Sequence, residues 1–208
     1  MEKIAIEIRN LQRTEISEMA EHFKKGQMGS SAVPVKRNPI KSERISSLSK
    51  LLRSQVSTSF ENIPLWHERD LSNSANERFI IPMTSILLDE MLETMIKIIT
   101  NLQVNTKRVK ENLYVTKGQI FAEFVLEALI KKGVPRFKAY RDVQRVAFEA
   151  HEKEIDYMDA LSSDKTISSV LSTNEIKSIF VAEKHLGASV TIISNVEKHV
   201  KAYAKKFF

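Results

Sequence analysis

Residues 26–43, GQMGSSAVPVKRNPIKSE, bring reactive side chains and backbone-breaking residues together. Two of the five glycines and two of the five prolines in the chain fall within the first fourteen residues of this segment. Paired serines offer hydroxyl groups, Lys36 and Arg37 offer positive charge, and Asn38 offers an amide donor. These donors match a carboxylate or a developing oxyanion, which catalytic sites stabilise with preorganised dipoles and cations. From composition alone, the segment is either an anion-binding loop or a surface loop of common polar residues.

The composition of the 208-residue chain favours a helical protein. Gly and Pro are sparse, and 42% of residues are apolar, so long helices with a real core are expected. The lack of Cys excludes disulfides, thiolate metal sites and a Cys nucleophile, and it suits a cytoplasmic protein. The charged residues in MEKIAIEIRNLQ argue against a signal peptide. The sequence contains no run of about 18 apolar residues, so no membrane span is predicted.

The net charge of +6 does not by itself indicate a nucleic-acid partner. Lys and Arg alternate with acidic residues along the expected helices, which is typical of solvated helix faces. The sequence has no aromatic-rich basic segment of the kind that binds nucleic acid. We therefore expect neither a nucleic-acid nor a membrane partner.

In the first half of the chain, long helices must position the loop. Apolar spacing predicts helices over residues 2–23, 40–60 and 72–102, with a loop over 26–39 and a kink at Pro82. The second half of the third helix is apolar on nearly every face, which is typical of a buried helix. A chain of this length cannot cover so much apolar surface, so we expect a multi-helix or multi-subunit bundle.

Shorter, capped helices are predicted after residue 105. One runs over 119–132 and closes on Gly133, and another starts at Pro135 and reaches about residue 153. The sequence Ser172-Thr-Asn-Glu175 predicts a capping box for a helix that stops at Gly187, and a last helix follows over 188–208. The fold is therefore predicted as all-α, with long bundle helices over 1–104 and a small helical domain over 105–208.

The order of residues in the loop resembles a pattern shared by the fumarase/aspartase superfamily. That pattern is GSS-x-x-P-x-K-x-N-P, and the chain matches every defined position with Gly29, Ser30, Ser31, Pro34, Lys36, Asn38 and Pro39. The flanking stretches IRNLQRTEISEMAEHF and KRNPIKSER, together with NIPLWHERDLSNSANER further along, resemble the adenylosuccinate lyase family within that superfamily. Val33 and Val35 depart from the residues usual at their positions. The resemblance implies that residues 1–104 are the C-terminal part of a central helical bundle, followed by a small C-terminal domain.

The resemblance implies a role for several residues in and just after the loop. Ser30 corresponds to the catalytic base, and Ser31 is the alternative base or a carboxylate binder. Lys36 and Asn38 correspond to residues that contact the fumarate-forming carboxylates. Glu43 corresponds to an acid that pairs with a histidine of another subunit. The alternatives are a surface ion pair for Glu43 and a simple loop-capping role for Ser30.

Three further positions correspond to nucleotide-binding residues, namely Arg69, Ser74 and Arg78, and two guanidiniums suit a phosphate. Arg69 and Arg78 could equally belong to a lattice of salt bridges with the neighbouring acids. Arg44 corresponds to a substrate-contacting residue in some relatives. We interpret Trp66 as a packing anchor and His67 as structural.

The activity implied by the resemblance is β-elimination of fumarate. Adenylosuccinate would give AMP, and the related purine intermediate SAICAR would give AICAR, with no cofactor and no metal. Family members are homotetramers of chains about twice this length, and their active sites combine segments of three subunits. Their two catalytic histidines lie in an N-terminal half that this sequence does not contain, so the chain alone is expected to be inactive. The alternatives are another lyase of the superfamily, such as an argininosuccinate lyase or a cycloisomerase, and a non-catalytic helical interaction module.

Overall fold

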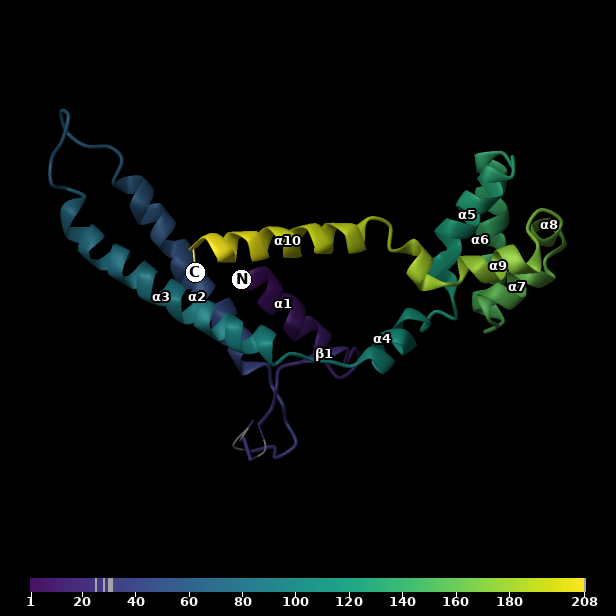
Figure 1. Cartoon of the computed structure of the whole chain (residues 1–208), viewed down its shortest axis with the longest axis horizontal. Coiled ribbons are helices and arrows are strands. Elements are labelled where there is room, and N and C mark those ends of the chain that lie inside the picture. Colours follow the sequence, from purple (N-terminus) through teal and green to yellow (C-terminus); the bar gives the residue numbers. More distant parts are fainter. Residues whose placement is uncertain (25, 28, 30–31, 208) are drawn as a thin grey trace. The chain divides into compact units, whose positions relative to one another are not determined.

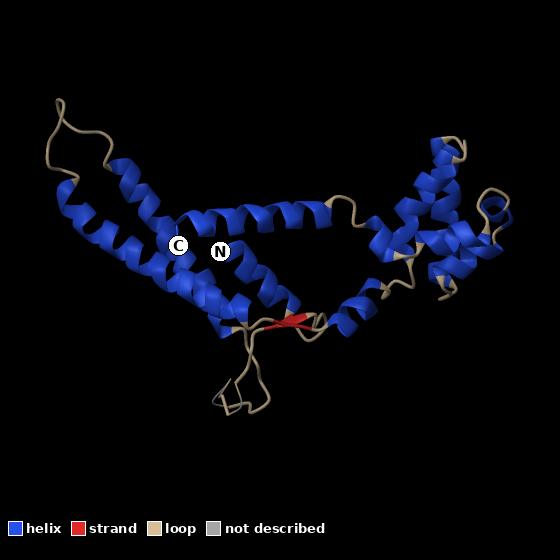
Figure 2. Cartoon of the chain, in the orientation of Figure 1, coloured by secondary structure: helices blue, strands red, loops and turns tan. Residues whose placement is uncertain are grey.

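The computed structural model describes residues 1–24, 26–27, 29 and 32–207, with residue 207 described for its backbone alone. The chain divides into two compact units, Met1–Asn112 and Leu113–Phe208. Nearly all regular structure is helical, as the blue ribbons of Figure 2 show, so the predicted all-α fold is confirmed. In the described part of the chain, no helix is both long enough and apolar enough to cross a membrane.

The first unit is built from four helices and one pair of very short strands in the described residues. In chain order these are α1 (Glu2–Leu11), β1 (Met19–Ala20), α2 (Ile40–Glu61), α3 (Ser74–Thr100), β2 (Gln103–Val104) and α4 (Thr106–Leu113), whose last residue begins the second unit. The strands pair antiparallel, with Met19 opposite Val104.

Helix α1 is shorter than the sequence pattern predicts. It ends at Leu11 rather than continuing to residue 23, so this part of the prediction is wrong. Ser17 has a φ of 54°, a left-handed value that cannot continue a helix. The amide of Glu18 donates to the carbonyl of Leu11, and the carbonyl of Glu18 accepts from the amide of Asn105. A tertiary hydrogen bond from Asn105, just after β2, and a local one to Leu11 therefore replace helical bonds at Glu18, although Ile16 and Met19 continue the apolar spacing.

Helices α2 and α3 form a hairpin that extends away from the loop over residues 21–39 (Figure 1). Their connection, residues 62–73, lies at the end of the hairpin opposite to the 21–39 loop. Helix α1 packs on α2, and the shared core contains one side chain of α2 and several of α1 and α3. These residues are Ala5, Ile8, Ile45, Met91, Met95 and Ile98.

One side of α3 is buried against this core, while much of its apolar surface is exposed. Leu88, Leu92, Ile96 and Ile99 are all exposed, although the same helix buries Met91, Met95 and Ile98. Exposed apolar surface of this extent on neighbouring helical turns is typical of an interaction surface. The chain therefore leaves its bundle incomplete, as the apolar pattern of this helix predicts.

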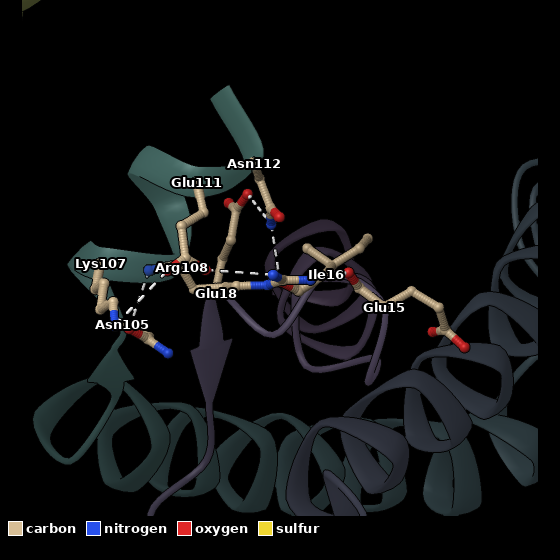
Figure 3. A network of polar contacts seen from close by, with 8 residues as sticks. All are labelled: Glu15, Ile16, Glu18, Asn105, Lys107, Arg108, Glu111 and Asn112. Carbon is tan, nitrogen blue, oxygen red and sulfur yellow. Dashed lines mark hydrogen bonds and ion pairs between the residues drawn. The ribbon is translucent and has the colours of Figure 1, made fainter. Parts of the chain in front are cut away.

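Polar contacts attach α4 to the turn that follows α1, as Figure 3 shows. The guanidinium of Arg108 donates from Nε to the carbonyl of Ile16 (3.1 Å) and from Nη2 to that of Glu15 (2.9 Å). Asn112 Nδ2 donates to the carbonyl of Ile16 (2.8 Å) and to Glu18 Oε1 (2.9 Å). These bonds keep nearly all of α4 in the first unit. That unit therefore ends at Asn112, later than the boundary at residue 104 that the sequence predicts.

The second unit is a set of short helices followed by one long helix. The elements are η1 (Gln119–Phe121), α5 (Ala122–Lys131), α6 (Arg136–Glu152), α7 (Tyr157–Ser163), α8 (Lys165–Ser168), α9 (Thr173–Ile179), η2 (Ala182–His185) and α10 (Ser189–Phe207). The core gathers Phe121, Val125, Leu129, Val146, Leu161 and Ile176, with Tyr157 among them.

Two predicted helix ends in this unit are confirmed, and one is wrong. Gly133 has a φ of 89°, its amide donates to the carbonyl of Ile130, and the next amide donates to that of Leu129. This is the Schellman arrangement that a C′ glycine permits. Ser172 and Glu175 form the predicted capping box. The helix they open ends at Ile179 rather than Gly187, because a separate turn of 3₁₀ helix follows, from Ala182 to His185.

Candidate active site

The returning arm of the 21–39 loop forms one wall of an open pocket in the first unit. The pocket has a volume of about 720 Å³. Lys36, Asn38 and Glu43 line it, the first two from the loop and the third from the first turn of α2. Arg9 and Arg13 line it from α1 and the turn that follows. The structure therefore brings together three of the side chains to which the resemblance assigns roles in the reaction.

The pocket carries an excess of positive charge. Its charged lining consists of four cations, Arg9, Arg13, Lys36 and Arg37, and one carboxylate, Glu43. None of these five side chains forms an ion pair with another described residue. A small anion would lower the mutual repulsion of these cations and could use them as hydrogen-bond donors. The alternative of a surface ion pair for Glu43 is not seen among the described residues.

The side chain of Gln12, before the loop, and that of Glu21, at its start, hold the two ends of the loop together. Gln12 Nε2 donates to the carbonyl of Arg37 (2.8 Å), and Gln12 Oε1 accepts from the amide of Glu21 (2.9 Å). The carboxylate of Glu21 accepts from the amide of Ser42 (2.6 Å), the hydroxyl of Ser42 (2.6 Å) and the amide of Lys41 (3.3 Å). The departing arm of the loop is thus joined both to the returning arm and to the N-terminus of α2.

Close packing also constrains the loop near Gly29. A Cβ atom at Gly29 would lie 2.0 Å from the carbonyl oxygen of Lys36 and 3.1 Å from the ring of Phe23. The guanidinium of Arg37 lies over that same ring, 5.6 Å from its centre, at cation–π distance. The glycine of the pattern is therefore needed for the close approach of the two arms, and Arg37 has a packing role beyond that of a surface cation.

The two serines of the pattern, Ser30 and Ser31, lie outside the described residues. Their assignment as catalytic base and carboxylate binder stays a prediction. The roles of Lys36, Asn38 and Glu43 are also predictions, although their side chains share one pocket.

Arg44 is directed toward α3 instead of the pocket. Its Nη1 atom lies 3.1 Å from Glu90 Oε1, an atom that also accepts from the hydroxyl of Thr94 (3.2 Å). Arg44 is absent from the pocket lining. The structure therefore gives this arginine a contact between helices, and its contact with substrate stays a prediction.

The residues assigned to the nucleotide lie at the other end of the α2–α3 hairpin. Arg69 is in the 62–73 connection, and Ser74 and Arg78 are in the first turns of α3 (Figure 1). A helix rises 1.5 Å per residue, so the 22 residues of α2 separate this end from the loop by roughly 33 Å. Within one chain, these three residues and the pocket cannot contact the same small molecule.

The 62–73 connection has its own ordered geometry. The carboxylate of Asp70 accepts from the hydroxyl and amide of Ser72 (2.6 and 2.8 Å) and from the amide of Trp66 (2.6 Å), and these bonds lower the pKa of Asp70. Asn62 and Asn76 exchange amide hydrogen bonds of 2.8 and 2.7 Å. These contacts shape the backbone that carries Arg69.

Two interpretations of this connection are wrong within the chain. Neither Arg69 nor Arg78 forms an ion pair with a described residue, so the predicted alternative of a salt-bridge lattice is absent there. Trp66 is 80% exposed and is no packing anchor within this unit. His67 is also exposed and has a φ of 55°, so it serves the turn by its backbone.

Sequence reasoning missed Gln12 and Glu21, the residues that join the ends of the loop. Both lie in a segment whose apolar spacing predicted an uninterrupted helix, and that prediction left their side chains no tertiary role. The one signal in the sequence was that α2 begins after Pro39 with no side-chain acceptor of its own at the cap position, so an acceptor had to come from elsewhere.

Comparisons with known proteins agree along the length of the chain. A family described as "Adenylosuccinate lyase C-terminus" matches residues 118–196, and one described as "Lyase" matches residues 1–52. An adenylosuccinate lyase of Thermotoga maritima is 41% identical over 198 residues, which is 95% of this chain and 46% of that protein. The chain thus spans about half the length of the curated relative it matches.

Solved structures show the same fold. A 3-carboxy-cis,cis-muconate lactonizing enzyme from Pseudomonas putida is 26% identical with a TM-score of 0.82, over 96% of this chain and 45% of that one. A fumarate lyase from Mesorhizobium sp. BNC1 is 22% identical with a TM-score of 0.80, over 94% of this chain and 42% of that one. The family matches and the 41% identity thus show that the chain is similar in sequence to adenylosuccinate lyase, with residues 118–196 matching the C-terminus of that family, and the solved structures show the same fold.

Proposed function

We propose that the chain is the part of an adenylosuccinate lyase that supplies the carboxylate-binding loop and one segment of the nucleotide pocket. The assembled enzyme would release fumarate from adenylosuccinate and from SAICAR, leaving AMP and AICAR. The observation that carries the proposal is that Lys36, Asn38 and Glu43 line one cation-rich pocket. The 41% identity to an adenylosuccinate lyase supports the choice of substrate.

The reaction proposed is a β-elimination, which is a carbon–nitrogen lyase step. A base, assigned to Ser30, removes a proton from the methylene carbon of the succinyl group. This carbon is bonded to one carboxylate and to the carbon that carries the leaving nitrogen. The electron pair is held on that carboxylate as an aci-carboxylate dianion, and it then forms the C=C bond of fumarate. The C–N bond breaks, and the nitrogen takes its electron pair and a proton from a general acid. Lys36 and Asn38 would hold the dianion, since fixed cations and dipoles stabilise such charge best where water is excluded.

The general acid is not assigned to any residue of this chain. The resemblance assigns it to a histidine in segments that precede the match, and Glu43 would orient another such histidine from a neighbouring subunit. The chain alone would then be inactive. The exposed apolar surface of α3 supports assembly with further helices, as in a homotetramer with shared sites.

Assembly also accounts for the distance between the loop and the nucleotide residues. Arg69, Ser74 and Arg78 lie at the far end of the α2–α3 hairpin from the pocket (Figure 1). In a symmetric bundle, the end of one hairpin can meet the loop of a second copy. Arg69 and Arg78 would then hold a phosphate beside the carboxylate-binding loop of another subunit.

The test is reconstitution from two parts. The purified chain is mixed with the portion of the Thermotoga maritima relative that precedes the matched region, and fumarate release is measured with adenylosuccinate, SAICAR and argininosuccinate. We expect release from the first two substrates by the mixture and none by either part alone. Release from argininosuccinate alone would assign the chain to a different lyase activity. A mixture that associates but releases no fumarate would favour a non-catalytic interaction module.

A further inference from the structure

Helix α2 begins without a capping side chain of its own. The residue before its first turn is Pro39, which has no side-chain acceptor, and the first amides of a helix have no intrahelical partners. Lys41 and Ser42 are the second and third residues of this helix, whose amides a capping side chain normally serves. Both amides donate to Glu21, which precedes Lys41 by 20 residues and Ser42 by 21.

We propose that Glu21, oriented by Gln12, is a positioning residue for the pocket formed by Lys36, Asn38 and Glu43. Its carboxylate caps α2 across the 21–39 loop and so fixes the first turn of that helix relative to the returning arm. We call Gln12, Glu21 and Ser42 the loop clamp. The inference rests on the proposed function for its catalytic meaning, but the hydrogen bonds of the clamp do not.

The environment of Glu21 explains why it can hold this position. The side chain is only 7% exposed, and it accepts three hydrogen bonds, two of them from Ser42 at 2.6 Å. A carboxylate is stabilised at the positive end of a helix dipole, and hydrogen bonds to an ionised group are about twice as strong as neutral ones. Removing the carboxylate would leave buried donors of α2 without a partner, which is costly.

Gln12 extends the clamp to the other arm of the loop. Its amide oxygen accepts from the amide of Glu21, while its amide nitrogen donates to the carbonyl of Arg37. One side chain from the end of α1 is therefore bonded to the departing arm and to the residue between Lys36 and Asn38. Since α1 is packed in the core through Ala5 and Ile8, the clamp attaches both arms of the loop to a rigidly held helix.

The consequence is a fixed distance between groups that must act together. Glu43 follows Ser42 directly, and Lys36 and Asn38 flank Arg37. Catalytic groups must be held to within about 0.5 Å of the productive geometry, and a shift of about 1 Å can cost about a hundredfold in rate. The hydrogen bonds of the clamp reach Arg37 and Ser42, which are sequence neighbours of the three pocket residues, and they can therefore supply that precision.

The first measurement is amide hydrogen exchange on the purified chain, which needs no activity. In Glu21→Ala, the amides of Lys41 and Ser42 should exchange at least about tenfold faster than in the unsubstituted chain, because each loses a charge-assisted bond. Ser42→Ala removes only the hydroxyl donor and should give a smaller increase. Glu15→Gln is the matched control, since the Glu15 side chain is exposed and has no described partner, and it should change neither rate.

The second measurement is steady-state kinetics of the reconstituted enzyme with Glu21→Gln. This variant keeps the size of the side chain and one acceptor oxygen but loses the charge. We expect kcat per active site to fall about tenfold or more, with little change in thermal stability. Glu15→Gln should leave both kcat and thermal stability unchanged. A merely structural role would lower stability and the amount of active enzyme without changing kcat per active site.

The outcomes separate the clamp from the proposed function. Unchanged exchange at Lys41 and Ser42 in Glu21→Ala overturns the clamp, whatever the activity. Faster exchange with an unchanged kcat in Glu21→Gln overturns its positioning role. If the unsubstituted pair of parts releases no fumarate, the proposed function fails and the catalytic meaning of the clamp fails with it, whereas the exchange result still decides whether the hydrogen bonds exist.

Discussion

Arg44 on α2 and Glu90 on α3 form an ion pair, with Nη1 of the arginine 3.1 Å from Oε1 of the glutamate. Both side chains are about half exposed, so we expect a coupling free energy of about 0.2–1 kcal/mol. A double-mutant cycle with Arg44→Gln and Glu90→Gln, measured by urea unfolding of the chain, gives this value. The coupling should shrink at high salt, because exposed charges are screened.

The same two variants decide the role of Arg44 in the reconstituted enzyme. If the arginine serves only the contact between α2 and α3, both variants change the kinetics equally. A KM that rises in Arg44→Gln but not in Glu90→Gln contradicts this account and restores the substrate contact implied by the resemblance.

Gly29→Ala should damage the site through the backbone. The new Cβ atom would lie 2.0 Å from the carbonyl oxygen of Lys36, so the two arms must separate. A displacement of about 1 Å at Lys36 predicts a loss of about a hundredfold in kcat of the reconstituted enzyme. Gly26→Ala is the control, because no atom of the described residues lies within 4 Å of its added Cβ and the cost seen there is the φ of 81°. Equal activity of the two variants would contradict the close approach of the arms.

Tyr157→Phe should stabilise the second unit. The hydroxyl of Tyr157 is fully buried and has no hydrogen-bond partner among the described residues. Since an unsatisfied buried donor is costly, its removal should raise the free energy of unfolding by about 1–2 kcal/mol. Urea unfolding measures this, and Tyr140→Phe at an exposed position should lie within about 0.5 kcal/mol of the unsubstituted chain. A destabilised Tyr157→Phe would show that the hydroxyl has a partner.

The same residue predicts a loss of stability at alkaline pH. Burial raises the pKa of Tyr157, so above pH ~10 the unfolded chain loses a phenolic proton that the folded chain keeps. The unfolded state then binds fewer protons, and the free energy of unfolding falls as pH rises through this range. In urea unfolding measured at a series of pH values above 10, the free energy of unfolding should fall less steeply in Tyr157→Phe. An equal fall in the two proteins would contradict this prediction.

Glu175 should contribute to the loss of stability of the second unit at acid pH. Lys132 and then the amide and hydroxyl of Ser172 bond its carboxylate and lower its pKa from 4.5 to about 2. The carboxylate therefore contributes stability above pH 4.5, and this contribution is lost as pH falls toward 2. Glu175→Gln should flatten the loss over that window in a pH series of thermal melts. Glu183→Gln, at an exposed carboxylate without a described partner, should leave it unchanged.

Local patterns in the sequence predicted the helices that depend on local causes. The helix at Ile40 begins where the prediction placed it, Gly133 closes α5 and Ser172 opens α9, since caps and apolar spacing act within a few residues. The exposed apolar face of α3 was also foreseen, because a helix that is apolar all round needs partners that a short chain cannot supply.

Long-range hydrogen bonds explain what the sequence did not reveal. The end of α1 at Leu11 depends on contacts of residues 12–18 with Arg37, Asn105 and Arg108, which are far away along the chain. At the end of α9, the hydroxyl of Tyr114 donates to the carbonyl of Phe180 (2.9 Å), which is also far away along the chain. In the site, residue order indicated Lys36, Asn38 and Glu43, whereas Gln12 and Glu21 became visible only through their bonds across the loop.

The most direct test of the central claim is fumarate release from adenylosuccinate by the reconstituted enzyme with and without Lys36. We expect no release by either part alone and release by the mixture. Lys36→Met should lower kcat/KM of the mixture by at least about a hundredfold, because the cation that holds the developing dianion is gone. Release that is the same with Lys36→Met, or release by the 208-residue chain on its own, would contradict this claim.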